Sequence, residues 1–391
     1  MTRNVLLVHQ SADLYGSDRM LLRVIDAIRA GGGHPIAVLP SSGQLGEALR
    51  DHGAEVHVAP VGKLTRASLS IRGSARLMGD LWDVSGALDQ IVARRSIDLV
   101  HSNTLAVLGG ALWARRRRIA HCWHVHEIVE TPKLAERSFV RALEWGADLV
   151  ICNSRSTAQW LSTASRTRVD SRIRVIRNAI RPPDRTDREE VERYRMLFNR
   201  GDSSAITIGL VGRVNGQKGH DLLLNAAERL ASRGLSGFSL VFVGDAPAGG
   251  RSYLSALEDR ISRSSVRDRT VRVPFVLNPW PVYAALDIVC VPTQQTESFG
   301  LVALEAMHQG RPVVASRVQG LTELIDDGRT GLMFDPRDVD QLADHLAHLV
   351  QDGERRGQLG RDAQEHVEVN LDATHFERQL LQAYRELSPY W

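Results

Sequence analysis

Short runs of apolar residues alternate along the chain with longer segments in which apolar residues recur every three or four positions. The short runs predict buried strands, and the longer segments predict helices packed over them. This repeated order is typical of parallel sheets covered by helices on both faces. Strands are expected at 4–9, 35–39, 55–59, 97–101, 119–125, 148–152, 173–177, 205–211, 238–243, 270–274, 286–291 and 312–315. Helices are expected at 17–30, 43–51, 71–95, 136–146, 219–233, 251–263 and 300–309.

One stretch, 183–203, breaks the alternation with a proline and a run of charged residues, so we expect it to link two domains. A chain of 391 residues is long enough for two. The prediction is an α/β fold with two doubly wound Rossmann-like domains, 1–182 and 204–373, that face each other across a cleft. An amphipathic helix within 374–391 is expected to pack back on the first domain.

The composition is that of an ordinary soluble globular protein, with 43% hydrophobic and 24% charged residues. The three cysteines lie within apolar runs and are odd in number, which indicates buried thiols in a reducing compartment. The apolar part of the first nine residues is too short for a signal peptide. These features predict a cytoplasmic protein.

Positive charge is concentrated in the first half of the chain. Residues 1–180 hold 24 basic and 16 acidic side chains, although the whole chain carries only +3. The imbalance favours either peripheral contact with an anionic surface, such as the inner face of the cell membrane, or a solvated surface without a partner. The four arginines at 115–118 follow an expected helix, where cations are favoured electrostatically, and we do not expect nucleic acid as a partner.

Two carboxylates flank an expected helix start in the second domain. Glu297 lies in the turn after the strand 286–291, and Glu305 lies about two turns along the following helix. Between them the main-chain N–H groups of Phe299, Gly300 and Leu301 would point out of the helix start, where anions bind. Phosphate at the helix start and hydroxyls at the acids together suit a nucleotide sugar.

A glycine-rich loop is expected at the start of the same domain. Gly212 and Gly219 bracket it, and Arg213 and Lys218 place two cations on it that suit a diphosphate. The spacing differs from both the Walker loop and the dinucleotide fingerprint. Taken alone, the loop could also be a tight turn with solvated charges.

Together these motifs resemble the retaining glycosyltransferases of family 4, which adopt the GT-B fold. The resemblance extends to the segment 320–331 and covers nearly all of the chain. It implies that Arg213 and Lys218 bind the donor diphosphate, that Glu297 binds the donor sugar and that Glu305 binds the ribose. The donor site expected from it comprises Gly16, Gly212, Arg213, Lys218, Glu297, Ser298, Phe299, Gly300, Leu301 and Glu305.

Histidines are concentrated in the strand 119–125 and just after it. His124 and His126 share one face, and His126 lies at the carboxyl end, where ligands of such sheets bind. The resemblance implies a histidine beside the reacting sugar, with His126 the first choice and His124 the second. A buried structural histidine remains an alternative, and a zinc site that includes His121 is a less favoured one.

The first strand-to-helix loop is expected to approach the donor and the acceptor. The resemblance implies a glycine-rich turn there, represented by Gly16 and Ser17, although the usual second glycine is replaced by serine. Ser17 could cap the following helix, and Asp18 could face the acceptor or only favour the helix start. Asn103 ends another strand and is a further candidate for the acceptor side.

The sequence therefore predicts a retaining glycosyltransferase that needs no metal or cofactor and takes a nucleotide-diphosphate sugar as co-substrate. His126, Arg213, Lys218 and Glu297 are the expected catalytic residues. The expected acceptor is a lipid-linked glycan in cell-surface polysaccharide or glycolipid assembly. A soluble small-molecule acceptor, a nucleotide-sugar 2-epimerase and a non-catalytic sugar-nucleotide-binding protein are the alternatives.

Overall fold

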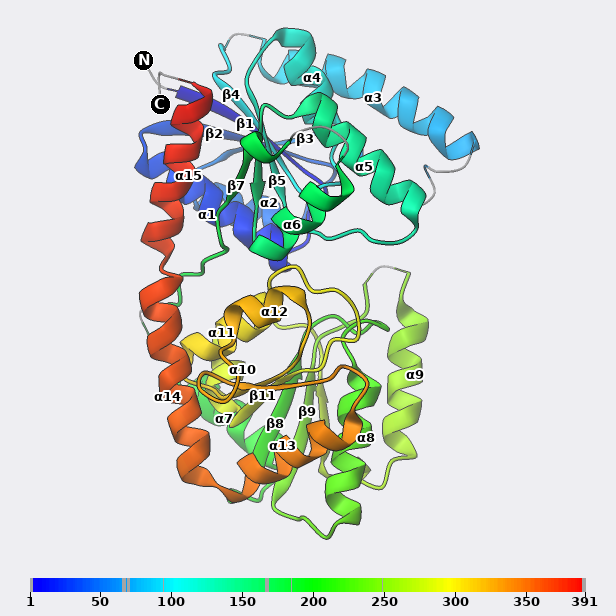
Figure 1. Cartoon of the computed structure of the whole chain (residues 1–391), viewed down its shortest axis with the longest axis vertical. Helices are drawn as coiled ribbons and strands as arrows, with labels where there is room; N and C mark the ends of the chain where they lie inside the picture. The colour runs from blue at the N-terminus through cyan, green and yellow to red at the C-terminus, as the bar shows by residue number, and fades with distance from the viewer. Residues whose placement is uncertain are drawn as a thin grey trace. The chain divides into compact units, whose positions relative to one another are not determined.

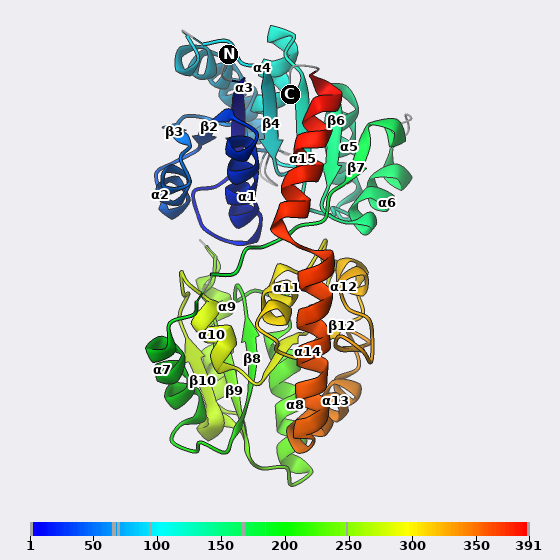
Figure 2. The same ribbon diagram turned by 90° about the vertical axis from the view of Figure 1, so that its left-hand side faces the viewer.

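The computed structural model describes residues 3–64, 68, 71–93, 95–165, 169–183, 185–247 and 249–388. The chain folds into two compact units, each an α/β domain, which Figures 1 and 2 show from two sides. Unit 1 comprises Met1–Ala179 and Ala373–Trp391, and unit 2 comprises Ile180–Asp372. Among the helices of the described ranges, none combines the length and apolar character needed to cross a bilayer.

Unit 1 contains a seven-stranded parallel sheet in the order β3-β2-β1-β4-β5-β6-β7. Chain order runs outward from β1 on one side and from β4 on the other, so the topological switch point lies between β1 and β4. Ligands of open α/β sheets bind at the carboxyl ends of the strands beside such a point. The strands are β1 (Arg3–His9), β2 (Gly33–Leu39), β3 (Glu55–Val58), β4 (Leu99–Asn103), β5 (His121–Val125), β6 (Leu149–Cys152) and β7 (Ile173–Val175).

Helices cover both faces of this sheet (Figure 1). On one face Leu6 and Val8 of β1 share a buried cluster with Val84 and Leu88. The alternation of side chains along each strand supplies such clusters to both faces. The helices are α1 (Gly16–Ala30), α2 (Gln44–Asp51), α3 (Ile71–Ile91), α4 (Gly109–Arg117), α5 (Lys133–Gly146), α6 (Arg155–Ala164) and α15 (Ala373–Leu387).

Unit 2 contains a six-stranded parallel sheet in the order β10-β9-β8-β11-β12-β13, with its switch point between β8 and β11. Its strands are β8 (Ile206–Val211), β9 (Phe238–Val243), β10 (Thr270–Val273), β11 (Ile288–Val291), β12 (Val313–Ser316) and β13 (Leu332–Phe334). Its helices are α7 (Arg188–Asn199), α8 (His220–Ser232), α9 (Arg251–Ser262), α10 (Trp280–Ala285), α11 (Leu301–His308), α12 (Gln319–Leu324), α13 (Val339–Gln351) and α14 (Gly353–Asn370).

The expected α/β architecture is confirmed, and all twelve expected strands are present with ends shifted by at most two residues. One strand was missed. β13 pairs with β12 at the edge of the second sheet but is only three residues long. A segment this short has no periodic pattern that distinguishes it from a loop.

The segment expected to link the domains and the last helix of the chain each pack into one of the two units. Residues 183–203 include α7, and Phe198 of this helix is fully buried in the core of unit 2. At the end of the chain, α15 packs beside α1 in unit 1 (Figure 2). Tyr384 of α15 is fully buried, and its hydroxyl lies 2.7 Å from Nδ1 of His101 in β4. The last helix is therefore part of the packing of unit 1.

Candidate functional site

In unit 2, the loops that follow β8 and β11 are joined at the switch point. The main-chain oxygen of Gln217 accepts hydrogen bonds from the Gln294 N–H (2.8 Å) and the Thr293 hydroxyl (3.0 Å). Gly219 has φ = 74°, and a Cβ added there would lie 1.9 Å from the carbonyl oxygen of Pro292. Glycine is required at this contact, which holds the cation-bearing loop against the carboxyl end of β11.

The same two loops bring Lys218 and Glu297 into contact. Nζ of Lys218 lies 2.7 Å from Oε2 of Glu297, and the two side chains are 28% and 19% exposed. Partial exposure leaves both groups accessible to a ligand. Arg213 lies on the β8 loop next to Gly212, and both are half-buried. The structure therefore brings Lys218 and Glu297, both predicted from the sequence as site residues, into direct contact at the switch point.

Helix α11 begins at Leu301, four residues after Glu297. Phe299 is 3% exposed and anchors the turn in the core, while Ser298 and Leu301 are half-buried. Gly300 has φ = 98°, and a Cβ there would lie 2.4 Å from Cδ2 of a leucine in α12, so only glycine fits this helix start. The first N–H groups of a helix lack partners within the helix and carry partial positive charge. The helix end near the Lys218–Glu297 pair thus presents partial positive charge, which favours an anion.

Glu305 occupies a more enclosed position on α11. It is 6% exposed, and its Oε2 accepts a 2.7 Å hydrogen bond from the hydroxyl of Tyr283. Tyr283 belongs to α10 and is fully buried. The carboxylate is thus held in one orientation by a neighbouring helix, in a place where a charge needs hydrogen bonds to remain buried.

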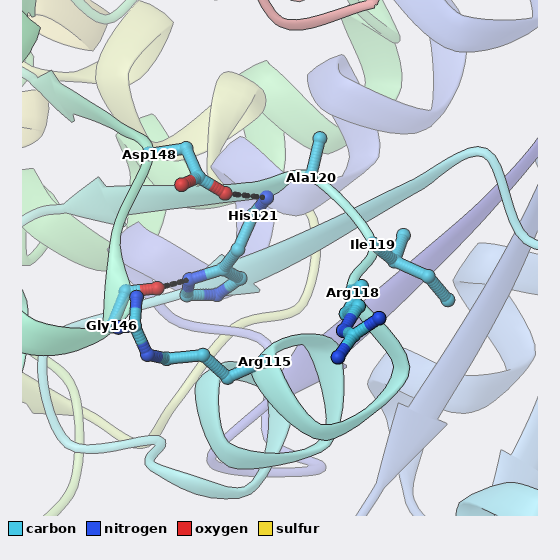
Figure 3. A pocket seen from close by; sticks show the side chains of 7 residues that line it. All are labelled: Arg115, Arg118, Ile119, Ala120, His121, Gly146 and Asp148. Atoms are coloured by element: carbon cyan, nitrogen blue, oxygen red, sulfur yellow. Dashed lines mark hydrogen bonds between the residues drawn. The ribbon is translucent and has the colours of Figure 1, made fainter.

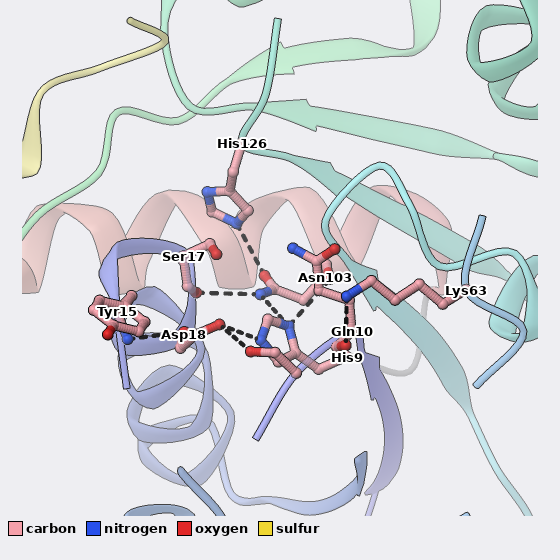
Figure 4. A network of polar contacts seen from close by, with 9 residues as sticks. His9, Gln10, Tyr15, Ser17, Asp18, Lys63, Asn103 and His126 are labelled. Atoms are coloured by element: carbon pink, nitrogen blue, oxygen red, sulfur yellow. Dashed lines mark hydrogen bonds and ion pairs between the residues drawn. The ribbon is translucent and has the colours of Figure 1, made fainter. Parts of the chain in front are cut away.

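In unit 1, four buried side chains form a continuous chain of hydrogen bonds (Figure 4). His9 Nε2 lies 2.7 Å from Asp18 Oδ1, and His9 Nδ1 lies 3.0 Å from Asn103 Nδ2. Asn103 Oδ1 in turn lies 3.0 Å from His126 Nε2. His9 and Asn103 end the two strands at the switch point, and His126 follows β5. The chain of bonds therefore runs along the carboxyl edge of the sheet.

The direction of each bond follows from its neighbours. The Asp18 carboxylate only accepts, so His9 donates through Nε2–H. Nδ1 of His9 lies 3.2 Å from the main-chain oxygen of Asn103 and 3.0 Å from its side-chain amide nitrogen. The same amide nitrogen donates to the main-chain oxygen of Ser17 at 3.3 Å, which fixes the orientation of the amide group. The amide oxygen then accepts from Nε2–H of His126, and the lone pair of this imidazole lies on Nδ1.

Electrostatic interactions along this series of hydrogen bonds keep Asp18 anionic and His126 neutral. Burial would raise the pKa of Asp18, but the hydrogen bond from His9, attraction to His9, and the bonds from the Tyr15 N–H (2.8 Å) and the Ser11 hydroxyl (2.9 Å) lower it. Burial and repulsion by His9 lower the pKa of His126 to about 3. At neutral pH, His126 is an uncharged imidazole with a defined tautomer.

Two residues expected on the acceptor side, His124 and Ser17, are placed differently from the expectation, and Asp18 takes its alternative role at the helix start. Asp18 is 1% exposed and is used by internal hydrogen bonds. His124 is fully buried between the sheet and α15, with its ring stacked on Phe376 at 6.4 Å between centroids. Helix α1 begins at Gly16, so Ser17 lies inside the first turn and does not cap it. The carboxyl edge of this sheet exposes neither Asp18 nor His124 to a ligand.

The three histidines of this region do not assemble a metal site. The ring of His121 lies 2.7 Å from the Gly146 oxygen and 2.9 Å from the Ser102 hydroxyl, away from His126. Throughout the part of the chain that the structure describes, no group of three His, Cys, Asp or Glu side chains is arranged to hold a metal ion. The zinc alternative has no ligand set among these residues.

Sequence reasoning did not single out His9 or Tyr283. His9 is a polar residue at the last position of an apolar strand beside the switch point, and that position was a usable signal. Tyr283 gave no such signal, because it lies in a short helix between other apolar residues. Its contact with Glu305 depends on the packing of two helices.

Two family models match the chain. The model described as "Glycosyltransferase Family 4" matches residues 16–182, and the model described as "Glycosyl transferases group 1" matches residues 205–352. The matches cover most of unit 1 and most of unit 2.

Named relatives and solved structures are consistent with these models. The D-inositol 3-phosphate glycosyltransferase of Kribbella flavida is 40% identical over 171 residues, which span 42% of this chain and 40% of that protein. The sulfoquinovosyl transferase SQD2 of Arabidopsis thaliana is 27% identical over 292 residues, which span 71% of this chain and 54% of that protein. The match thus spans only about two fifths to one half of these relatives' lengths.

The crystal structure of Anabaena Alr3699/HepE in complex with UDP and glucose superposes with a TM-score of 0.84 at 23% identity. The superposition covers 98% of this chain and 100% of that one, and at this identity it supports the fold alone. Sucrose-phosphate synthase of Thermosynechococcus elongatus gives a TM-score of 0.77 at 20% identity, with both chains fully covered. Since both units match glycosyltransferase models and the architecture is that of GT-B enzymes, the chain belongs to the family 4 glycosyltransferases.

Proposed function

We propose that this chain transfers a sugar from a nucleotide-diphosphate sugar to an acceptor hydroxyl with retention of anomeric configuration. The observation that carries the proposal is the Lys218–Glu297 pair beside the start of α11 at the switch point of unit 2. A cation, a helix start and an acid at one strand edge suit a ligand with both phosphate and hydroxyl groups. The UDP and UDP-glucose bound in the Anabaena HepE structures support the same class of donor.

In this proposal Arg213 and Lys218 bind the donor diphosphate, and the N–H groups of Phe299, Gly300 and Leu301 complete its binding site. As the bond to the sugar breaks, negative charge grows on the departing diphosphate. Fixed positive and dipolar groups stabilise that charge, and each such donor typically contributes about 10²–10³ in rate. These protein groups take the place of a divalent cation. The acceptor attacks on the face from which the diphosphate leaves, so no side chain needs to act as a nucleophile.

The two acids distinguish the two ends of the donor. Glu297 accepts hydrogen bonds from the hydroxyls of the transferred sugar, and its contact with Lys218 keeps both side chains directed to one point. Glu305 accepts hydrogen bonds from the ribose, and Tyr283 fixes its orientation. Donor specificity then depends on rigid acceptors placed before the ligand arrives.

His126 is proposed to accept a hydrogen bond from a hydroxyl of the reacting sugar through Nδ1. The low pKa of this imidazole means that it supplies no positive charge at neutral pH. The turn at Gly16 brings main-chain groups to the same strand edge. Asp18, His9 and Asn103 act indirectly in this proposal, because they hold the tautomer and orientation of the ring.

For the acceptor, we propose a lipid-linked glycan at the inner face of the cell membrane, which fits the basic first half of the chain. A small phosphorylated polyol is a second candidate, because several relatives are named D-inositol 3-phosphate glycosyltransferase. Incubation with one donor and each acceptor class, followed by product analysis, separates the two.

The proposal is tested first by a thermal-shift screen of nucleotide-diphosphate sugars, since a ligand bound by the native state raises the melting temperature. The best donor is then incubated with and without acceptor. Transfer that requires the acceptor and yields a retained linkage is the expected result. Conversion of the donor without acceptor would favour a 2-epimerase, and donor binding without turnover on either acceptor class would favour a non-catalytic binding protein.

A further inference from the structure

Helix α5 buries one face in unit 1 and exposes a straight stripe on the other. Leu134, Arg137, Arg141 and Trp145 are all exposed and follow one another at intervals of three or four residues, which aligns them along the helix. Leu134 is 63% exposed and Trp145 is 50% exposed, large values for apolar side chains of this size. The stripe therefore has two arginines between two apolar ends.

The acids of α5 lie off this stripe. Glu136 is 8% exposed and accepts hydrogen bonds from Lys133 (3.1 Å) and from the indole N–H of Trp160 (3.3 Å). Glu144 accepts a 2.6 Å hydrogen bond from the Ser165 hydroxyl. Neither carboxylate forms an ion pair with the arginines of the stripe, which consequently keeps its positive charge.

The positive surface continues onto the end of α4. The guanidinium of Arg115 lies 5.1 Å from the ring centre of Trp145, a cation–π distance. Arg115 and Arg118 line a cavity of about 380 Å³ at the amino ends of β5 and β6 (Figure 3). Asp148 also lines it, and this carboxylate accepts a 2.9 Å hydrogen bond from the main-chain N–H of His121.

Arg115 and Arg118 differ from the arginines between them in the sequence, which form ion pairs. Arg117 lies 2.6 Å from Asp89 of α3. Within the described ranges, by contrast, no carboxylate forms an ion pair with Arg115, Arg118 or the two stripe arginines. Four exposed guanidinium groups without acidic partners on neighbouring helices form a surface that attracts an anion larger than a single ion.

We propose that the docking surface, defined as Leu134, Arg137, Arg141, Trp145, Arg115 and Arg118, binds unit 1 to an anionic lipid bilayer. A bilayer offers phosphates to the guanidinium groups and an interfacial layer that favours exposed tryptophan and leucine side chains. An acidic protein or a nucleic acid would match the charge but would leave both apolar ends in water. Helix α5 begins seven residues after His126, so the Leu134 end of this surface lies toward the carboxyl edge of the sheet, whereas Arg115 and Arg118 lie at the amino ends of β5 and β6. A lipid-borne acceptor docked at the Leu134 end would therefore start near His126, a step that rests on the proposed function.

Helix α3 is the rival surface in the same unit. Met78 and Trp82 on it are 69% and 84% exposed, and exposed arginines occur at 72 and 76. Asp80 and Asp83 lie on the same part of α3, so the two positive charges are balanced. A bilayer with negative surface potential gains little from such a helix, and this is why α5 is preferred.

The test is co-sedimentation of the full chain with phosphatidylcholine vesicles that contain or lack about one third phosphatidylserine, at low and at high salt. The wild-type chain is expected to bind only the anionic vesicles, and less at high salt. Arg137→Ala/Arg141→Ala should lower the partition coefficient roughly thirtyfold, from about fivefold for each basic residue. Arg72→Ala/Arg76→Ala on α3 is the matched control, with the same charge change on an exposed helix of the same unit, and should leave binding within about twofold of wild type.

A third variant separates a bilayer from other polyanions. Trp145→Ala should weaken binding to anionic vesicles and leave binding to soluble heparin unchanged. Equal vesicle binding by wild type and the α5 double variant, loss of binding in the α3 variant instead, or retention on heparin without vesicle binding would each overturn the proposal. Donor binding is followed in parallel by thermal shift. Its absence would contradict the proposed transferase function and leave the vesicle result standing.

Discussion

Lys218 Nζ lies 2.7 Å from Glu297 Oε2, although the two residues are 79 positions apart and belong to the loops after β8 and β11. Both side chains are partly exposed, and an ion pair of this kind contributes only about 0–1 kcal/mol to folding stability. The contact therefore has little value as a structural support. Ligands of open α/β sheets bind at such switch points, which is why we propose that the pair holds the donor.

Replacing Lys218 with alanine should reduce turnover far more than it reduces stability. The departing diphosphate would lose its point charge, and the expected loss in kcat is on the order of 10²–10³. The melting temperature should change by no more than about 2 °C, because the pair is partly solvated. Initial rates at saturating donor and thermal unfolding provide the two measurements.

The matched control is Arg233→Ala. Arg233 also forms a partly exposed ion pair in unit 2, at 2.5 Å from Asp344, on the outer side of α8 and α13. Its removal should leave the transfer rate within about twofold of wild type, since the pair is only a surface contact. A Lys218→Ala enzyme with the wild-type rate would remove the main support for the donor site in unit 2.

Tyr283→Phe should lower both the stability of unit 2 and its affinity for the donor. The change removes the hydroxyl that donates to Glu305, and losing a hydrogen bond to a buried charged group costs about 1.5–3 kcal/mol. The Glu305 carboxylate would also lose one of the contacts that fix its orientation toward the ribose. Urea unfolding measures the first effect, and titration with the nucleotide diphosphate measures the second. A stable variant with unchanged nucleotide affinity would show that Glu305 does not depend on Tyr283 to bind the donor.

Much of the fold could be predicted because its signals are local. Buried parallel strands are short apolar runs, and Gly212, Gly300 and Glu297 each follow such a run at the carboxyl end. Both loops of unit 2 that carry the expected donor residues flank the switch point, which the topology places between β8 and β11. Sequence spacing therefore sufficed to identify the motifs, and strand order explains why they meet.

The contacts inside unit 1 could not be predicted in the same way. His124 and His126 alternate correctly along one face, but the sequence does not indicate that α15 covers His124 with Phe376. Asp18 has the position of an ordinary helix-start acid, and only the fold brings it to His9. The first outcome depends on packing between segments distant in sequence, and the second depends on the conformation of the short loop between β1 and α1. Periodicity encodes neither.

Asn103→Ala should release the tautomer of His126. Without the amide oxygen as acceptor, the proton on Nε2 is no longer favoured and a fraction of the rings should carry it on Nδ1. Nitrogen NMR of labelled histidine reports this fraction directly, and kcat should fall on the order of tenfold to a hundredfold from misplacement of the ring. Ser11→Ala, which removes only one of the bonds to Asp18, is the control and should retain the tautomer. A wild-type tautomer in the Asn103 variant would contradict the assigned direction of the chain of bonds.

Acid should destabilise unit 1 through its buried histidines. Burial is the main cause that lowers the pKa of His101 to about 3, of His121 to about 4 and of His126 to about 3, and it lowers that of His124 as well. These groups are neutral in the native state, whereas in the unfolded chain they bind protons below about pH 6.5. The unfolded state then holds more protons than the native state, so the free energy of unfolding falls as the pH drops from about 6.5 toward 4. Above about pH 6.5 the stability contributed by the neutral histidines is retained in full.

His124→Leu isolates one of these groups. Its ring nitrogens have no hydrogen-bond partner among the described residues, so leucine removes a titrating group without breaking a bond. The variant should equal or exceed the wild type in stability at pH 7.5 and should lose less stability between pH 7 and pH 5, by up to about 1.4 kcal/mol per pH unit. Urea unfolding at a series of pH values measures the slope, and His348→Gln, at an exposed position of unit 2, should leave it unchanged. A slope in His124→Leu as steep as that of the wild type would show that acid sensitivity arises at the other buried histidines.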